Sequence, residues 1–379
     1  MAADRMRIVA KIGTASITDE TGMIDETAVA KLAEEVSALH HLGHEVVVVS
    51  SGAVAAGVAE LNLGTRPSDM QTLQAVSAVG QSRLVEQYNV EFTRHGVVGA
   101  QLLVDSMDFV ARRQYLHLRS TVEKLLELRV VPIVNENDAI ANDELRYGDN
   151  DLIAALIANS VGADVLALLT DMDGVFTADP RDNRDAKLIP FVGADDPLLA
   201  IRTSVGGSGR GSGGMASKLT AARMASWSGI RAVIARAARP NVLAGAVSAD
   251  PVGTTLEAHD RVLSARKLWI AFAAEIAGTL VVDDGARRAL VDRPNSLLPA
   301  GVVRVVGRFG AGDVIDIASS DGTVFARGIA AIDGTLAGSS AGRHTRELPD
   351  GIDEVVHRDD LVVFEPVTQI SARAVGPRR

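Results

Sequence analysis

Up to about residue 260, short apolar runs rich in β-branched residues alternate with longer segments whose apolar positions recur at helical spacing. The run Val46–Val49 has no polar alternation, which is typical of a strand buried on both faces of a sheet. We expect strands at Ile8–Ile12, Val46–Val49, Val97–Val104, Val130–Val134, Val165–Leu169 and Ala232–Ala235. We expect helices at Glu26–Leu42, Ala53–Leu61, Met70–Arg94, Tyr115–Leu128, Leu152–Asn159 and Met215–Ser228. The alternation predicts an α/β fold, a three-layer αβα sandwich around a mainly parallel open sheet.

After about residue 260 the pattern changes to short strands separated by turns, which predicts a small β-barrel domain. The expected strands are Gly278–Val282, Gly301–Val306, Asp313–Ile317, Val324–Ile329 and Leu361–Phe364. We therefore expect one large domain over residues 1–258, a linker over 259–275, the β-barrel domain over 276–362 and a tail over 363–379.

Composition narrows the classes of protein that fit. The chain has no cysteine, which excludes disulfides, thiolate metal sites and a cysteine nucleophile, and favours a reducing compartment. Its net charge of −10 gives no overall attraction to nucleic acid or to an anionic membrane. The longest uncharged stretch, residues 46–59, is shorter than the roughly 20 residues that a membrane span needs. The N-terminal residues lack the apolar core of a signal peptide, so we expect a cytoplasmic protein with no membrane partner.

Two groups of residues at predicted strand ends could bind an anion. Lys11 and Gly13 close the first strand, where the glycine lets an anion approach the backbone and the lysine supplies a compact charge. Residues 50–57 (SSGAVAAG) join a buried strand to a helix whose first N–H groups could hold a carboxylate or a phosphate. The alternatives are a lysine at a strand edge and an ordinary N-cap with close helix packing.

Acidic and amide side chains gather around the end of another predicted strand and the start of the helix that follows. They belong to residues 135–138 (NEND) and 148–151 (GDND). Loop and cap chemistry could explain either group by itself, because Asp and Asn are preferred helix caps. The two groups together favour a polar binding pocket.

A glycine-rich loop, residues 206–218 (GGSGRGSGGMASK), runs into a predicted helix that contains Lys218. Such a loop can surround phosphates, with the lysine one turn into the helix; a flexible linker is the alternative. Residues 209–214 match G-x-G-x-x-G, but no strand immediately precedes them and no acid follows about 20 residues on, which excludes a dinucleotide-binding motif. The chain also lacks a Walker A sequence.

Two other patterns suggest metals, and each has a better explanation. Residues 40–44 (HHLGH) could be zinc ligands, but their position at a predicted helix end favours imidazoles near the helix C-terminus with Gly43 in the left-handed cap position. Residues 171–174 (DMDG) lack the remaining ligands of a calcium loop. We therefore assign no metal-binding residues.

Two lysines on glycine-bearing loops, an acidic pocket and no evident nucleophile–base pair predict phosphoryl transfer, a reaction in which positioning and charge stabilisation dominate. An acceptor carboxylate with a pKa near ~4.3 is already ionised at neutral pH and needs no general base. The absence of an obvious catalytic histidine is then expected.

In chain order the motifs resemble those of the amino-acid kinase family over about residues 6–255. They are VAKIGT (9–14), SSGA (50–53), VNEND (134–138), GDND (148–151), TD (170–171) followed by GVFTADPR (174–181), and GGM (213–215) leading to Lys218. The NEND and GDND pair resembles in particular the branch that phosphorylates glutamate. From Ile276 to about Asp360 the chain is similar to a PUA domain, including the HRDD sequence at 357–360.

The resemblance implies ATP-dependent phosphorylation of the L-glutamate γ-carboxylate to L-glutamyl 5-phosphate, the first step of proline biosynthesis, with Mg²⁺ as cofactor. It implies that Lys11 and Lys218 neutralise charge on the transferred group, and that Asp151 holds both lysines. The implied glutamate-binding residues are Ser51, Gly52, Asp138, Asp149 and Asn150, with Asp138 or Asp149 suited to the α-ammonium group. The implied ATP-binding residues are Lys11, Gly13, Thr170, Asp171, Ser212, Gly213, Gly214, Met215, Ala216, Ser217 and Lys218.

The resemblance further implies feedback inhibition by proline and a homo-oligomer, a dimer or a tetramer. The first alternative is a related kinase acting on acetylglutamate, aspartate or a nucleoside monophosphate. The second is RNA binding by the PUA-like domain. Residues 276–379 argue against RNA, because they contain 12 arginines and no lysine against 14 acidic residues, a net charge of −2, and their only aromatic residues are Phe309, Phe325 and Phe364.

Overall fold

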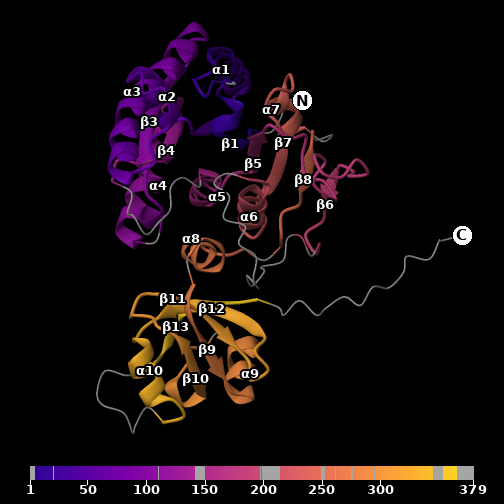
Figure 1. Cartoon of the computed structure of the whole chain (residues 1–379). Helices are drawn as coiled ribbons and strands as arrows, with labels where there is room; N and C mark the ends of the chain where they lie inside the picture. Colours follow the sequence, from indigo (N-terminus) through magenta and orange to yellow (C-terminus); the bar gives the residue numbers. More distant parts are fainter. Residues whose placement is uncertain are drawn as a thin grey trace, which may run out of the picture. The chain divides into compact units, whose positions relative to one another are not determined.

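The computed structural model of the protein describes residues 5–19, 21–109, 111–140, 150–196, 198, 214–248, 252–260, 262–274, 276–293, 295–344 and 353–364. These residues form two compact units, of which the second begins at Arg266 (Figure 1). The structure has two short helical segments, Ala265–Leu268 and Trp269–Ala273, within the range predicted as a linker. The four ranges expected from the sequence stay a prediction.

The first unit contains an eight-stranded sheet with the order β3-β4-β2-β1-β5-β7-β8-β6. Every neighbouring pair is parallel except β7 and β8. The strands are β1 (Arg7–Ile12), β2 (Glu45–Ser50), β3 (Val98–Val104), β4 (Val130–Glu136), β5 (Val165–Thr170), β6 (Phe191–Val192), β7 (Arg231–Arg236) and β8 (Thr254–Leu256). This agrees with the predicted mainly parallel sheet, to which the structure adds β6 and β8, both too short to show a periodic pattern.

Helices cover both faces of the sheet, which gives the predicted three layers. On one face lie α1 (Glu26–His41), α3 (Met70–Arg94) and α7 (Val242–Val247), with α2 (Ala53–Glu60) packed on α3. On the other face lie α4 (Arg112–Glu127), α5 (Asn150–Val161) and α6 (Met215–Ser226). Helix α4 begins three residues before its predicted start, and α7 was not predicted because its six residues are too few to show helical periodicity.

Side-chain alternation along β1 decides which residues meet which helix layer. Ile8, Ala10 and Ile12 belong to one buried apolar cluster with residues of α1 and α7. Successive strand residues point to opposite faces, so Lys11 points toward the layer that contains α5. The cluster therefore anchors β1 in a register that buries a lysine on the other side of the sheet.

The order in which the chain adds strands reverses between β1 and β5, at the middle of the sheet. From β1 the chain continues through α1 to β2 on one side, whereas β7, which follows α6, pairs with β5 on the other side. In open α/β sheets ligands bind outside the carboxyl ends of the strands at such a point. The fold thus directs attention to the residues that end β1, β5 and the neighbouring β2 and β4.

The second unit contains a five-stranded sheet with the order β10-β9-β11-β12-β13, in which only β9 and β11 pair in parallel. Its strands are β9 (Ile276–Val282), β10 (Val302–Gly307), β11 (Val314–Ala318), β12 (Val324–Ala330) and β13 (Val356–Val363). Strand β13 begins five residues before its predicted start. Two helices were not predicted, α9 (Asp284–Asp292) and α10 (Gly334–Ser340). The residues before them, Asp283 and Asp333, are their N-caps, and their side chains accept the capping hydrogen bonds.

No helix in the part of the chain that the structure describes is long and apolar enough to cross a bilayer.

Candidate active site

Two lysines and one aspartate from three different elements meet in the first unit. Lys11 lies one residue before the end of β1, Asp151 in the first turn of α5, and Lys218 in the first turn of α6. The Nζ of Lys11 lies 2.6 Å from Asp151 Oδ1, and the Nζ of Lys218 lies 3.2 Å from Asp151 Oδ2. The three side chains are 4%, 0% and 5% exposed, so the structure brings all the predicted catalytic residues into one buried cluster.

The electrostatics of this cluster favour an ionised carboxylate and an excess of positive charge. Burial by itself raises the pKa of Asp151, but the two ammonium groups and the hydrogen bonds from Lys11 and Ser217 outweigh it, and the pKa is lowered. The hydroxyl of Ser217 donates to Asp151 Oδ2 at 2.6 Å. The cluster thus places two buried ammonium groups around one described carboxylate, an arrangement suited to an anionic ligand.

A second cluster consists of amides at the carboxyl ends of β2 and β4. Asn150, the first residue of α5, donates through Nδ2 to Asn135 Oδ1 at 3.0 Å and to Ser51 Oγ at 3.2 Å. The backbone N–H of Glu136 donates to Asn135 Oδ1 at 2.9 Å and to Asn150 Oδ1 at 3.3 Å. The predicted substrate residues Ser51 and Asn150 therefore lie together, and Asn150 directly precedes Asp151 in the sequence.

Asp138, the predicted partner of an ammonium group, lies two residues beyond β4. Its Oδ2 accepts a hydrogen bond from Ser77 Oγ at 2.7 Å. Burial raises the pKa of Asp138, while the bond from Ser77 lowers it and only partly compensates. Such a carboxylate is stabilised by an incoming cation.

Gly52 connects this cluster to α2 in a conformation that requires glycine. Its φ is +103°, in the left-handed region, and a Cβ there would lie 2.9 Å from Ile17 Cδ1. Gly13 has extended backbone at φ −84°, so it meets no such requirement. A Cβ at Gly13 would lie 3.5 Å from Lys11 Nζ, an ordinary van der Waals distance that places this residue beside the lysine.

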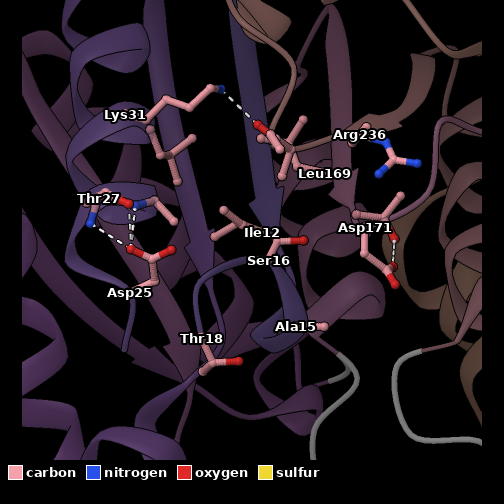
Figure 2. Close-up of a pocket in the computed structure, with 15 residues that line it drawn as sticks. Ile12, Ala15, Ser16, Thr18, Asp25, Thr27, Lys31, Leu169, Asp171 and Arg236 are labelled. Carbon is pink, nitrogen blue, oxygen red and sulfur yellow. Dashed lines mark hydrogen bonds between the residues drawn. The ribbon is translucent and has the colours of Figure 1, made fainter. Parts of the chain in front are cut away.

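The predicted ATP-binding residues Thr170 and Asp171 end β5, beside β1. The Thr170 hydroxyl donates to Asp171 Oδ1 at 3.0 Å. Both residues line a cavity of about 350 Å³ together with the ends of β1 and β7 and with α1 (Figure 2). Because Ile12 lines this cavity, the cavity lies on the α1 face of β1, opposite to the face toward which Lys11 points.

The charged groups in this cavity are largely paired within the protein. Lys31 donates to Glu35 at 2.7 Å and to the carbonyl of Ala237 at 2.8 Å, the bond visible at the top of Figure 2. Arg236 forms two hydrogen bonds with Asp173. The two lysines around Asp151 are therefore better candidates for binding phosphate than the charged groups of this cavity.

Part of the predicted site belongs to residues that the structure does not describe. Asp149, Ser212 and Gly213 lie outside the described residues. Of the glycine-rich loop the structure describes the end, where Gly214 precedes α6 with no side chain capping the helix, followed by Met215, Ala216, Ser217 and Lys218.

The histidines at 40–44 form a helix end, as the alternative to zinc predicts. Helix α1 ends at His41, and Gly43 has a φ of +97°. His44 Nδ1 accepts from the backbone N–H of Met6 at 3.1 Å, and His40 Nε2 lies 3.1 Å from the carbonyl of Arg129. Over the described ranges the structure contains no group of three side chains of the metal-binding types close enough to share an ion.

Sequence reasoning missed the contribution of α3. Its buried polar residues Ser77, Gln81 and Tyr88 contact Asp138, Asn135 and Ser50 at 2.7, 2.8 and 2.9 Å. These side chains lie among apolar residues and have no motif. The available signal was their spacing of four and seven residues, which places them on one face of a helix whose other residues on that face are apolar.

Comparisons with known proteins agree with the motifs. A model of the amino acid kinase family matches residues 6–236, and a PUA domain model matches residues 278–352. The glutamate 5-kinase of Mycobacterium ulcerans is 42% identical over 356 residues, which are 94% of this chain and 96% of that protein. The glutamate 5-kinase of Myxococcus xanthus is 45% identical over 364 residues, with the same two coverages. A solved structure of a UMP kinase from Bacillus anthracis has 17% identity and a TM-score of 0.46, covering 66% of this chain and 96% of that one, a score too low to support an argument.

The family match covers more than half of the chain, and its residues include both lysines and Asp151. The chain is a member of the amino acid kinase family with a C-terminal PUA domain. Within that family it belongs to the glutamate 5-kinases, because the similarity to them extends over nearly the whole length of both proteins.

Proposed function

We propose that this chain transfers the γ-phosphoryl group of ATP to the γ-carboxylate of L-glutamate, forming L-glutamyl 5-phosphate and ADP as the first step of proline biosynthesis. The observation that carries the proposal is the buried pair of Lys11 and Lys218 on one carboxylate. The names of the relatives supply the acceptor. The alternative acceptors acetylglutamate and aspartate, and RNA binding by the PUA domain, have no observation in their favour.

The lysines act by charge stabilisation. In phosphoryl transfer the three equatorial oxygens of the moving group carry the negative charge, and the acceptor and leaving oxygens lie roughly in line. Lys11 and Lys218 approach Asp151 from different elements, so each can donate to a phosphoryl oxygen while the carboxylate keeps both in place. The glutamate carboxylate attacks in its ionised form, and no residue has to remove a proton from it.

The order of strands along the sheet edge supports the assignment of the two substrates. The order β4-β2-β1-β5 puts Asp138 and Ser51 at one end, Lys11 in the middle and Thr170 at the other. We assign glutamate to the β4 and β2 ends, with Asn150 and Ser51 as its hydrogen-bond partners and Asp138 as the partner of its ammonium group. Asp149 remains the alternative ammonium partner. ATP is assigned to the β5 end and the start of α6.

Magnesium belongs to the proposal as the counter-ion of ATP. Mg²⁺ is commonly bound through one or two carboxylates together with substrate phosphates. The described side chains contain no three-ligand group that could hold a metal by itself. We therefore propose that the phosphates of ATP supply most of its ligands, and we assign it no protein residue. Inhibition by proline, a dimeric or tetrameric state and a cytoplasmic location are further parts of the proposal.

The proposal is tested by measuring ADP release with ATP and a panel of acceptors: L-glutamate, acetylglutamate, L-aspartate and UMP. We expect release with L-glutamate, and hydroxamate formation when hydroxylamine traps the acyl phosphate. Turnover of acetylglutamate, aspartate or UMP in preference to glutamate would overturn the assignment of the acceptor while leaving the kinase chemistry in place.

The raised pKa of Asp138 predicts how glutamate use depends on pH. The ionised carboxylate binds the ammonium group, so kcat/KM for glutamate should fall as the pH decreases through the pKa of Asp138, above the pH at which an ordinary aspartate protonates. Replacing Ser77 by alanine removes a hydrogen bond that lowers this pKa. The acid limb of the profile should then move to higher pH.

The matched control is Ser82→Ala, because Ser82 is exposed on the same helix. The ionisation of the substrate glutamate affects the pH profiles of both variants equally, so the difference between the two profiles reports on the enzyme. A limb that does not move in Ser77→Ala would remove Asp138 from glutamate binding.

A further inference from the structure

Helix α3 carries three buried polar side chains that each contact the edge of the sheet where we place glutamate. Ser77 donates to Asp138, and Tyr88 contacts Ser50, the neighbour of Ser51. Gln81 lies between them in the sequence, is 7% exposed and accepts a hydrogen bond from Asn135 Nδ2 at 2.8 Å. The proposed function gives none of these α3 residues a direct contact with substrate.

A backbone group determines the direction of the amide hydrogen bonds. The N–H of Glu136 can only donate, so the atoms that it contacts on Asn135 and Asn150 must be oxygens. The Nδ2 of Asn150 is then the atom directed to Asn135 and Ser51, and the Nδ2 of Asn135 is the atom directed to α3. The orientation of the amide side chains follows from one peptide group.

Gln81 completes this chain of hydrogen bonds, because the Nδ2 of Asn135 is a donor and requires an acceptor on α3. Its Oε1 receives the Asn135 amide. Its Nε2 is buried and has no hydrogen-bond partner among the residues that the structure describes. Gln81 therefore contributes to this chain as an acceptor through Oε1. Its donor, Nε2, makes no hydrogen bond within the described part of the protein.

The backbone of α3 cannot shift easily to compensate for a change at this position. A Cβ on Gly80 would lie 1.8 Å from the carbonyl oxygen of Ala53, and a Cβ on Gly57 would lie 1.9 Å from that of Val76. Helices α2 and α3 thus pack backbone against backbone. Because α2 begins directly after Ser51 and Gly52, this contact ties the position of Gln81 to that of the glutamate site.

We propose that Gln81 is a positioning residue for the acceptor substrate, which through Asn135 holds the side-chain amide of Asn150 in the orientation that binds glutamate. This inference rests on the proposed function. Without an acceptor at position 81, the buried Asn135 amide has no partner on α3 and can rotate. The oxygen that receives Asn150 Nδ2 then moves away, and glutamate binding weakens while the lysine cluster is unchanged.

The test is a comparison of Gln81→Met with Gln81→Glu by steady-state kinetics. Methionine removes the acceptor, and we expect the KM for glutamate to rise about five- to tenfold, with kcat and the KM for ATP within about twofold of the wild type. Glutamate at this position keeps an acceptor oxygen for the Asn135 amide and replaces the unpartnered donor by a second oxygen, and burial favours the neutral form of the new carboxyl group. We expect Gln81→Glu to stay within about threefold of the wild type in all three constants.

The matched control is Gln87→Met, the same substitution at a partly exposed position of the same helix, which should leave all constants unchanged. Equal shifts in the KM for glutamate and for ATP, or an unchanged KM for glutamate in Gln81→Met, would overturn the proposal. So would a Gln81→Glu variant as impaired as Gln81→Met. Failure of the proposed function is distinguishable, because the wild-type chain would then not phosphorylate glutamate at all.

Discussion

Replacement of Lys218 by alanine is expected to lower kcat at least about a hundredfold, which corresponds to about 3 kcal/mol of transition-state stabilisation. Lys218 is buried and lies 3.2 Å from Asp151, so its charge acts on the transferred group with little screening by water. The variant should still fold, because Lys11 continues to pair with Asp151. The measurement is ADP release at saturating glutamate and ATP.

The control for this variant is Lys187→Ala. Lys187 is exposed, and its hydrogen bonds in the described structure are made by its backbone, whose N–H donates to the hydroxyl of Thr177 and whose carbonyl accepts from the N–H of Thr177. Its replacement should leave kcat within about twofold of the wild type, since isolated surface charges contribute little. A near-normal kcat in Lys218→Ala would remove this lysine from the chemistry and with it the central argument for phosphoryl transfer here.

Replacement of Asp151 by asparagine is expected to lower both activity and stability. The change keeps the shape of the side chain but removes the carboxylate that pairs with two buried ammonium groups, and breaking a buried pair typically costs about 3–5 kcal/mol. The lysines also lose the group that holds them, so kcat should fall by at least about a hundredfold. Urea unfolding of the wild type and the variant at neutral pH measures the loss of stability.

The pH dependence of unfolding adds a second readout. The pKa of Asp151 is lower in the folded state than its ordinary value, 3.8. Its contribution to stability is therefore present above the unfolded pKa and is lost as the pH falls through the folded pKa. The difference in unfolding free energy between wild type and Asp151→Asn should shrink over that acidic range.

Asp173→Asn is the matched control, because Asp173 pairs with Arg236 on the surface, where its side chain is 57% exposed. Exposed pairs contribute about 0–1 kcal/mol. If Asp151→Asn were no more destabilising than Asp173→Asn, Asp151 would contribute no more to stability than a surface ion pair. The assignment of Asp151 as the residue that holds both lysines would then fail.

The hydrophobic periodicity of the longer elements was sufficient to predict most of the architecture. Six strands of the first sheet and its long helices show a clear period, and the buried run at Val46–Val49 correctly indicated helices on both faces. Short elements were missed, because six residues of α7 or three of β8 do not complete enough turns or alternations to stand out. The caps Asp283 and Asp333 were the available signals for α9 and α10.

The sequence by itself determined the family of the protein and predicted the residues proposed to carry its chemistry, because lysines, acids and glycines at strand ends form motifs that can be recognised without coordinates. The resemblance implied that Asp151 holds Lys11 and Lys218, and the tertiary structure supplied the contacts. Only the tertiary structure decided that Gln81 of α3 is linked through Asn135 to Asn150. The reason is physical. A motif records which residues occur near one another along the chain, whereas the contact of residues 67 positions apart, such as Asp151 and Lys218, depends on how helices pack against a sheet.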